Sequence, residues 1–510
     1  MPAPSSDTAD QPPREPPVRR PGDLGARAVL RIARTGRPPV LAPELLDRVG
    51  ERRARVLAAL ASGAPVYGVT TGMGALSERR LSEAEQARHQ EALALARSVG
   101  AAPWLDRVET RAVLAVRLRT FLNGDSGAGG ALCARLAELL AADVLPALPR
   151  TALGAAGEII PLAHLSAAVT GRGAVLDPAA PGAAAAAGPA LAAAGLAPLA
   201  LGPKEGVALI QGVPVTTGLA LLCADRARTV LRQCVRAVAG EFALTGAARD
   251  ALDPALARGD RALAATAAEV LRLAGRAGGS RALQPPVSFR VSAQVLAHLE
   301  RAVGAVEEAA GRALAGVTDS PAYAEDADGT GRFLGTAGFH GYDLAAHLHL
   351  LTTALAGAAE LGSVRLHRML DPKVTGLAAQ LSPDPGPHTG VSPVHKRAVG
   401  VVHGLRPLTA APTLGTMETS AGQEDVQSFS VEAAESCRLA LDGLTDVVAC
   451  ELLALHQARC LGAVLPEGAA ELGEVFDGLG AVLPDTPEDR FFGEDLVALR
   501  GLLRREQTGE

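Results

Sequence analysis

The sequence predicts an all-α fold: a large bundle of long antiparallel helices, with an N-terminal loop-and-helix domain that carries the candidate active-site segments. Residues 292–314 repeat apolar side chains at steps of three and four, and residues 342–370 and 426–456 do the same over lengths too great for isolated helices. No stretch of the 510 residues alternates as a convincing strand. Abundant Ala and Gly favour close approach between such helices.

Composition and length bound the other possibilities. The chain is 48% hydrophobic and 3% aromatic, with a formal net charge of −6, so it can bury one or more large cores. The mild acidity disfavours nucleic acid or an anionic membrane as principal partner. We divide the chain into a disordered tail over residues 1–22, an N-terminal domain over 23–215 and a central and C-terminal helical bundle over 216–510.

The first elements follow from local composition. Residues 1–22 are polar and rich in Pro, which predicts disorder, and they lack the apolar stretch of a signal peptide. Residues 43–61 have apolar side chains at helical spacing after Pro43, which suits a first helical turn. Residues 66–76 are a Gly-rich loop, and the absence of a following GK[ST] motif disfavours a phosphate loop. The pattern over residues 90–148 predicts two helices with a break near 100–104 and a polar loop at 123–127.

Metal and cofactor signals are weak. The six Cys residues are scattered without a CxxC pair, which is typical of reduced thiols in a cytoplasmic protein. His347 and His349 are two residues apart in a helical pattern, so they face different directions and form a poor metal site. A Schiff-base enzyme would have only Lys204, Lys373 and Lys396 to use. The Ala-rich run 178–203 is interrupted by Gly and Pro and does not predict a membrane span. We therefore expect no metal and no cofactor.

Residues 151–166, TALGAAGEIIPLAHLS, closely resemble the signature segment of the aromatic amino-acid ammonia-lyase family. Residues 66–76, VYGVTTGMGAL, resemble its second signature, in which a Tyr acts as catalytic base; Tyr67 holds that position. Similar segments follow in order over residues 27–505. They are GPKEGVALIQGVPV, LQPPVSFR, GTAGFHG, TSAGQED and a C-terminal DRFF.

One difference from the family affects the group that performs the family's chemistry. The family's Ala-Ser-Gly tripeptide cyclises into an electrophilic methylidene-imidazolone (MIO) ring, and the matching tripeptide here is Ala155-Ala156-Gly157. The exocyclic carbon of the ring comes from dehydration of the Ser side chain, and Ala156 has no oxygen to lose. We therefore expect an ordinary tight turn that leads into a helix at Pro161, and no MIO ring.

The resemblance assigns roles to several residues. It implies Tyr67 as base and Glu424 as amine partner or proton acceptor. Arg290 would hold a substrate carboxylate through its two-pronged guanidinium, and Phe339 would pack on the ligand. Gln284 is retained, while Arg97 replaces the His of histidine-specific members and Gln211 replaces an Asn. The family's second Tyr is Val287 here, and Gly338 and Gly422 stand where Asn is usual.

Three functional hypotheses stay open at this stage. The first is an MIO-independent enzyme that moves protons with Tyr67 on a small carboxylate-bearing, amino-acid-like substrate, by elimination, addition, isomerisation or cyclisation. The second is a catalytically silent relative that serves as a binding or scaffold protein. The third is a deaminase with another electrophile, for which no motif is visible. The resemblance also implies a homotetramer with active sites shared between subunits.

Overall fold

The computed structural model describes residues 16–276, 278–280, 282–415 and 417–508. The chain forms two compact units. The first contains residues up to Gly218 together with Gly311–Gly341 and Met417–Gln427, and the second contains Leu219–Ala310, Tyr342–Thr416 and the chain from Ser428 onward. The first unit therefore includes the segments that carry Phe339 and Glu424 as well as the N-terminal part of the chain.

The first unit consists of short and medium helices with two small antiparallel hairpins, β1–β2 and β3–β4. Its elements are α1 (Ala26–Thr35), α2 (Pro43–Ala61), α3 (Glu83–Arg97), α4 (Arg107–Leu122), α5 (Gly130–Ala141), α6 (Ile159–Val169), β1 (Ala174–Leu176), β2 (Ala184–Ala186), α7 (Ala187–Ala193), α8 (Glu205–Ile210), β3 (Ala322–Glu325) and β4 (Gly331–Leu334).

Capping residues explain where these helices begin. Pro43 opens α2, and Ser82 caps α3 in a reciprocal box with Glu85. Asp106 caps α4 in the same way with Glu109. Residues 90–148 therefore contain α3, α4 and α5 rather than the two helices we expected, because the polar segment 123–129 ends one helix before the next begins.

The expected disordered tail over residues 1–22 falls partly within the described residues. Residues 1–15 lie outside the described residues, but the chain from residue 16 onward is held in place. Val18 is buried and pairs in parallel with Leu41; its N–H donates to the Val40 carbonyl at 2.7 Å. Val18 is a single apolar side chain within a Pro-rich stretch. Its burial and backbone pairing hold this segment, although the composition of the stretch predicts disorder.

The second unit is built from long helices. The helices α9 (Pro214–Thr245) and α12 (Ser292–Ala315) pass from one unit into the other. The remaining helices are α10 (Arg261–Ala274), α11 (Val287–Arg290), α13 (Tyr342–Met369), α14 (Pro372–Thr375), α15 (Ser392–Leu405), α16 (Ser430–Cys460), α17 (Ala470–Gly480) and α18 (Phe492–Thr508). The all-α prediction is confirmed, and the two hairpins are its small exceptions.

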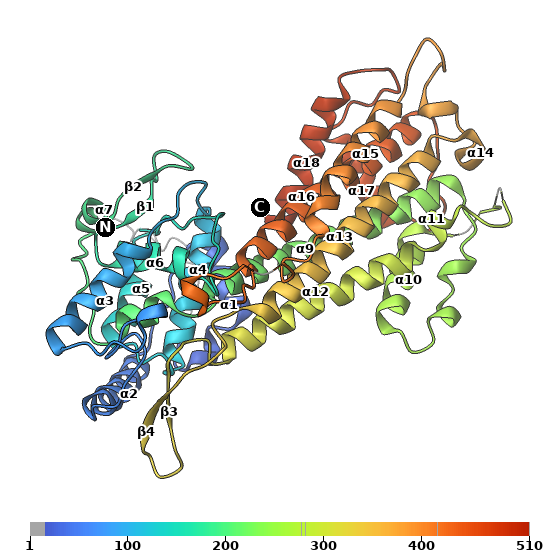
Figure 1. Cartoon of the computed structure of the whole chain (residues 1–510). Helices are drawn as coiled ribbons and strands as arrows, with labels where there is room; N and C mark the ends of the chain where they lie inside the picture. The colour runs from blue at the N-terminus through green and yellow to red at the C-terminus, as the bar shows by residue number, and fades with distance from the viewer. Residues whose placement is uncertain (1–15, 277, 281, 416, 509–510) are drawn as a thin grey trace, which may run out of the picture. The chain divides into compact units, whose positions relative to one another are not determined.

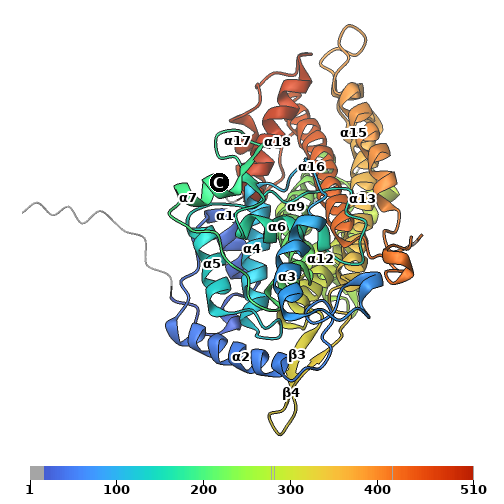
Figure 2. The ribbon, with the colours of Figure 1, turned by 60° about the vertical axis from the view of Figure 1, so that its left-hand side comes forward.

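In the second unit α13, α15 and α16 lie side by side (Figures 1 and 2). Side-chain pairs show the helix directions. Arg228 of α9 pairs with Glu307 of α12, and Phe242 near the end of α9 packs on Phe289 before α12, so these two helices are antiparallel. Arg397 of α15 likewise pairs with Asp446 of α16, whose neighbour Gly443 packs against Leu405 at the end of α15.

A buried ionic cluster joins three of these helices. Arg365 of α13 donates to Glu241 of α9 and to Glu451 of α16, each at 2.6 Å, and all three side chains are at most 3% exposed. Burial raises the pKa of Glu241 well above its ordinary value, and the nearby Glu451 carboxylate raises it further against the opposing charge of Arg365. One arginine thus compensates two carboxyl groups in the core of this unit.

Two helical stretches in the described part of the chain are long and apolar enough to cross a membrane by length and composition. In Glu205–Thr245 the apolar window is 89% buried inside the protein, and in Tyr342–Met369 it is 50% buried. Core helices of globular proteins pass the same test.

Candidate active site

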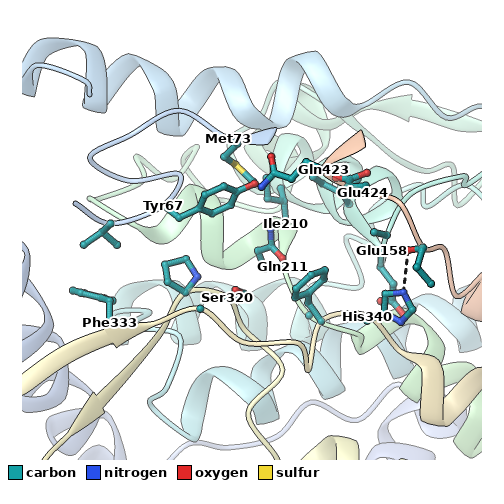
Figure 3. A pocket seen from close by; sticks show the side chains of 18 of the residues that line it. Tyr67, Met73, Glu158, Ile210, Gln211, Ser320, Phe333, His340, Gln423 and Glu424 are labelled. Atoms are coloured by element: carbon teal, nitrogen blue, oxygen red, sulfur yellow. Dashed lines mark hydrogen bonds between the residues drawn. The ribbon is translucent and has the colours of Figure 1, made fainter. Parts of the chain in front are cut away.

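Three segments distant in sequence converge in the first unit around a pocket of about 540 Å³. They are the loop after α2, the segment after β4, and the segment at 417–427; the tripeptide region and the end of α8 complete the walls. Five of the sequence-predicted site residues line this pocket: Tyr67, Ala156, Gln211, Phe339 and Glu424. Figure 3 shows Tyr67, Gln423 and Glu424 at one side and His340 at the other, with Gln211 between them.

Tyr67 is held by its own loop. The N–H of Gly74 donates to the Tyr67 hydroxyl oxygen at 2.9 Å, which leaves the hydroxyl proton free for another partner. The adjacent Gly68 is anchored by Gln90, which is 2% exposed: its amide donates to the Gly68 carbonyl at 3.0 Å and accepts from the Val207 N–H at 3.2 Å. Gln90 thus links the Tyr67 loop through α3 to α8.

We expect Gln90→Leu to lower the free energy of unfolding by about 2–4 kcal/mol, because each buried backbone group left without a partner costs about 1–3 kcal/mol. Urea denaturation measures the change. The matched control is Gln86→Leu, since Gln86 lies one turn earlier in α3 and makes one bond, to the Leu81 carbonyl. Equal effects from both variants would contradict the bridging role of Gln90.

Glu424 belongs to a tight loop that contacts the Tyr67 loop. Its backbone pairs with Thr419, and its Oε2 accepts from the Thr419 hydroxyl at 2.7 Å. The short helix Ser420–Gly422 packs on Gly74–Leu76, and a Cβ built on Gly74 would lie 4.0 Å from the Gln423 amide oxygen. The Oε1 of Glu424 has no hydrogen-bond partner among the described residues, so it is available to a ligand.

The tripeptide forms the predicted turn. The Gly157 N–H donates to the Ala155 carbonyl at 2.8 Å, and Gly157 has φ of +118°. A Cβ at Gly157 would lie 2.8 Å from the Phe339 carbonyl oxygen, so only Gly fits both the backbone conformation and the close approach. Ala155 is buried, and the side of the turn that carries Ala156 faces the pocket.

Glu158 follows the turn and was not among the predicted site residues. It lines the pocket yet is 2% exposed, and its two carboxylate oxygens accept from the N–H groups of Val215 and Thr216 at 2.7 Å each. Burial raises the pKa of Glu158 to about 7, against the opposing effect of these hydrogen bonds and of Arg117.

Arg97 ends α3 near the same residues. Burial lowers the pKa of Arg97, and the nearby Tyr67 and Glu424 oppose this shift. The guanidinium has no hydrogen-bond or carboxylate partner within the described chain. Arg97 is not among the residues that line the pocket.

Gln284 and Arg290 belong to the second unit. Gln284 is exposed, and Arg290 is the last residue of α11, next to the buried Phe289. Neither lines the pocket, all of whose lining residues come from the first unit. Tyr67 and Glu424 thus line one pocket of the first unit, and Arg290, the residue implied to bind the carboxylate, belongs to the second unit.

The remaining candidates have structural roles. Lys204 is fully buried and its Nζ pairs with Asp319 at 2.5 Å and with the Ser126 carbonyl at 2.7 Å, so it is not a free amine. A Cβ at Gly338 would lie 2.0 Å from the Val317 carbonyl oxygen, which excludes the family's usual Asn in this conformation. Among the described residues no three His, Cys, Asp or Glu side chains are grouped to hold a metal ion.

Comparisons with known proteins agree with this architecture. Residues 24–477 match the family model "Aromatic amino acid lyase". The chain is 34% identical over 504 residues to a probable histidine ammonia-lyase of Halobacterium salinarum, with 94% of each chain covered. It is 31% identical over 498 residues to a histidine ammonia-lyase of Anaeromyxobacter sp., with 94% of this chain and 97% of the relative covered.

The fold also matches solved structures. The ergothionase of Treponema denticola, an ergothioneine-degrading enzyme, superposes with a TM-score of 0.87 at 22% identity, covering 95% of this chain and 97% of that chain. The family match covers most of the chain, and the full-length relatives exceed 30% identity. The chain therefore belongs to the aromatic amino acid lyase family.

Proposed function

We propose that this chain is an MIO-independent enzyme that transfers protons with Tyr67 on a small, carboxylate-bearing, amino-acid-like substrate. The family and its relatives act on amino acids, which supports the substrate class. The observation that carries the mechanism is Tyr67, which lines the same pocket as Glu424 and whose hydroxyl oxygen accepts the Gly74 N–H. That hydrogen bond stabilises the oxygen when its proton is lost.

The residues of the tripeptide do not fit the family's prosthetic ring. Ring closure would join the Gly157 nitrogen to the Ala155 carbonyl carbon, and these two groups are already adjacent through a 2.8 Å hydrogen bond. The Ala156 side chain is a methyl group, so no water can leave from it to form the exocyclic carbon. We therefore assign no step to an MIO electrophile in this protein.

Intact-mass spectrometry tests this point directly. We expect the purified protein to have the mass of the unmodified chain, and Ala156→Ser to lose the mass of two water molecules as the ring forms. A wild-type mass lower by one or more waters, with the loss located in the peptide containing residues 155–157, would show a modified tripeptide and overturn the proposal.

The pocket supplies the other groups that such chemistry needs. The unpartnered Oε1 of Glu424 suits a substrate ammonium group, and Phe339 packs an apolar part of the ligand. Tyr67 would take a proton from a carbon next to the substrate's carbonyl or carboxylate and return it to the same or another atom. Elimination, addition, isomerisation and cyclisation all use this step.

Incubation in D₂O with amino acids, aryl acrylates and keto acids tests the activity, with mass spectrometry to follow deuterium uptake and ammonia release. We expect deuterium to enter at least one class of carboxylate. Release of ammonia and acrylate at rates typical of MIO enzymes would contradict MIO independence. No change in any compound would instead favour the silent binding or scaffold protein.

We further propose a homotetramer in which Arg290 serves the pocket of a neighbouring subunit. Arg290 does not line the pocket of its own first unit, and the side chains of Leu283 and Val287 beside it are 92% and 64% exposed, an apolar surface suited to a second copy. Light scattering measures the oligomeric state.

Complementation between subunits gives a sharper test of sharing. Tyr67→Phe and Arg290→Met should each be inactive alone, and their co-expression should restore a measurable fraction of activity in mixed oligomers. Two different affinity tags purify the mixed species. Mixed oligomers that remain inactive would contradict a site shared through these two residues.

A further inference from the structure

We infer that Arg117 is a positioning residue that holds Gln211 so that its side-chain amide donates a hydrogen bond to the substrate oxygen on which negative charge develops. This inference rests on the proposed function, because proton removal next to a carbonyl places charge on an oxygen. A donor held in a fixed position in the pocket would stabilise that charge.

Arg117 lies beneath the pocket in α4. Its side chain is 1% exposed, in a helix in which most of the residues are buried. One Nη donates to the backbone carbonyl of Gln211, and a Cβ built on Gly212 would lie 3.3 Å from the other. The guanidinium thus holds the backbone of Gln211 and leaves little space for a side chain at Gly212, and both residues line the pocket.

The cost of burying this cation points to a specific role. Burial lowers the pKa of Arg117 to about 10, and the charges of Asp319 and Glu158 offset part of that effect. Asp319 is itself paired with Lys204, so a buried network of charges runs under the segment that carries Gln211. A network with this many buried charges holds one geometry closely, because any displacement leaves a charge uncompensated.

Gln211 is fixed at its backbone and free at its side chain. It ends α8 in an extended conformation, and its side-chain amide has no hydrogen-bond partner among the described residues. Figure 3 shows it in the middle of the pocket, between Tyr67 and His340. An anchored backbone with an unpartnered amide is the arrangement expected of a ligand donor, because the donor's direction is set before the substrate binds.

The other side of Arg117 adjoins a cavity of about 10 Å³ lined by Thr318 and Asp319 among others. Arg117 Nε and Asp319 Oδ1 are both buried and have no protein partner in the described chain. This volume is about the least that holds one water molecule. One water donating to Asp319 and accepting from Arg117 would complete the support behind Gln211, and a high-resolution crystal structure should show it.

Hydrogen exchange separates positioning from general stability. In Arg117→Lys, which keeps the charge but loses the fork, we expect amide exchange in residues 205–213 to rise at least tenfold, while the 66–74 loop stays unchanged. Arg119→Lys is the matched control, since Arg119 is also buried in α4 but bonds to the Asn123 side chain. Faster exchange over the whole first unit, or the same local effect in the control, would overturn the positioning role.

Kinetics test the donor role with whichever compound exchanges deuterium. Gln211→Leu should lower kcat by about 10²–10³-fold, the usual loss for one such donor. Adding Arg117→Lys to it should cost little more, since both changes remove the same interaction. Unchanged kcat in Gln211→Leu alongside an inactive Tyr67→Phe would overturn the donor role and leave the proposed function standing. If the wild type turned over no compound, both the proposed function and the donor role of Gln211 would be contradicted. Amide hydrogen exchange would still decide whether Arg117 positions residues 205–213.

Discussion

Tyr67→Phe is expected to lower the rate of deuterium incorporation by about 10²–10⁴-fold, the usual contribution of a positioned general acid or base. The change removes one oxygen and leaves the ring, so packing in the loop is largely kept. The lost bond to the Gly74 N–H costs stability by only about 1 kcal/mol, too little to explain such a loss of rate. The measurement is the initial rate of deuterium uptake at substrate concentrations far below and far above KM.

Tyr323→Phe supplies the matched control for this prediction. The Tyr323 hydroxyl bonds to Glu325 on the same hairpin at 3.1 Å and is absent from the pocket lining, so the same chemical change is made outside the site. We expect its kcat to stay within a factor of two of wild type. A Tyr67→Phe variant that remains folded and retains more than a tenth of the wild-type rate would exclude Tyr67 as the base.

Arg365→Met is expected to produce the largest loss of stability, about 3–5 kcal/mol, because it leaves two buried carboxyl groups without their cation. Urea denaturation, followed by the helical signal of the protein, measures the change in the free energy of unfolding. Arg368→Met is the control, since Arg368 lies three residues further along α13 and has a His side chain as its partner. A loss below about 1 kcal/mol would contradict our assignment of Arg365 as the cation that compensates this core.

The same cluster predicts a pH dependence. The pKa of Glu241 is raised in the folded protein, so the folded state retains a proton that the unfolded state releases above about pH 4.3. The contribution of Glu241 to stability is therefore fully present below that pH and is lost as the pH rises towards the folded-state pKa. Glu241→Gln keeps the side chain neutral and should flatten the fall in stability between pH 5 and pH 8. If stability fell more steeply with pH in this variant than in the wild type, Glu241 would not be the group that retains the proton in the folded state.

Much of the fold was accessible from the sequence because long apolar periodicities are strong signals. Residues 43–61 were expected to be a helix and form α2, and the periods at 292–314 and 342–370 correspond to α12 and α13. The polar segment at 123–127 was predicted from the sequence. The separate helix α5 that begins after it was not predicted. The anchor at Val18 was missed, since one apolar residue in a Pro-rich tail gives no periodic pattern.

The candidate site residues were predicted from segments that resemble the motifs of a known family. Tyr67 and Glu424 carry recognisable motifs, but no sequence pattern could show that they line one pocket of the first unit. Glu158 could have been identified as the acidic residue beside the tripeptide; its shifted pKa depends on burial, which only the fold reveals. Arg117 gave no signal in the sequence, because Arg111 and Arg119 lie in the same helix and nothing in the pattern distinguishes Arg117 from them.

The path of the chain through the first unit has a consequence for biosynthesis. The chain leaves this unit at Gly218, returns for residues 311–341, and comes back for the last time at Met417, about 200 residues after it first left. At a ribosomal rate of ~5–20 residues per second, the N-terminal segments therefore wait roughly 10–40 s before the segment that carries Glu424 emerges. During that interval the half-built pocket exposes apolar surface, so this protein should depend on holdase chaperones during translation more than a protein whose N-terminal domain is continuous in sequence.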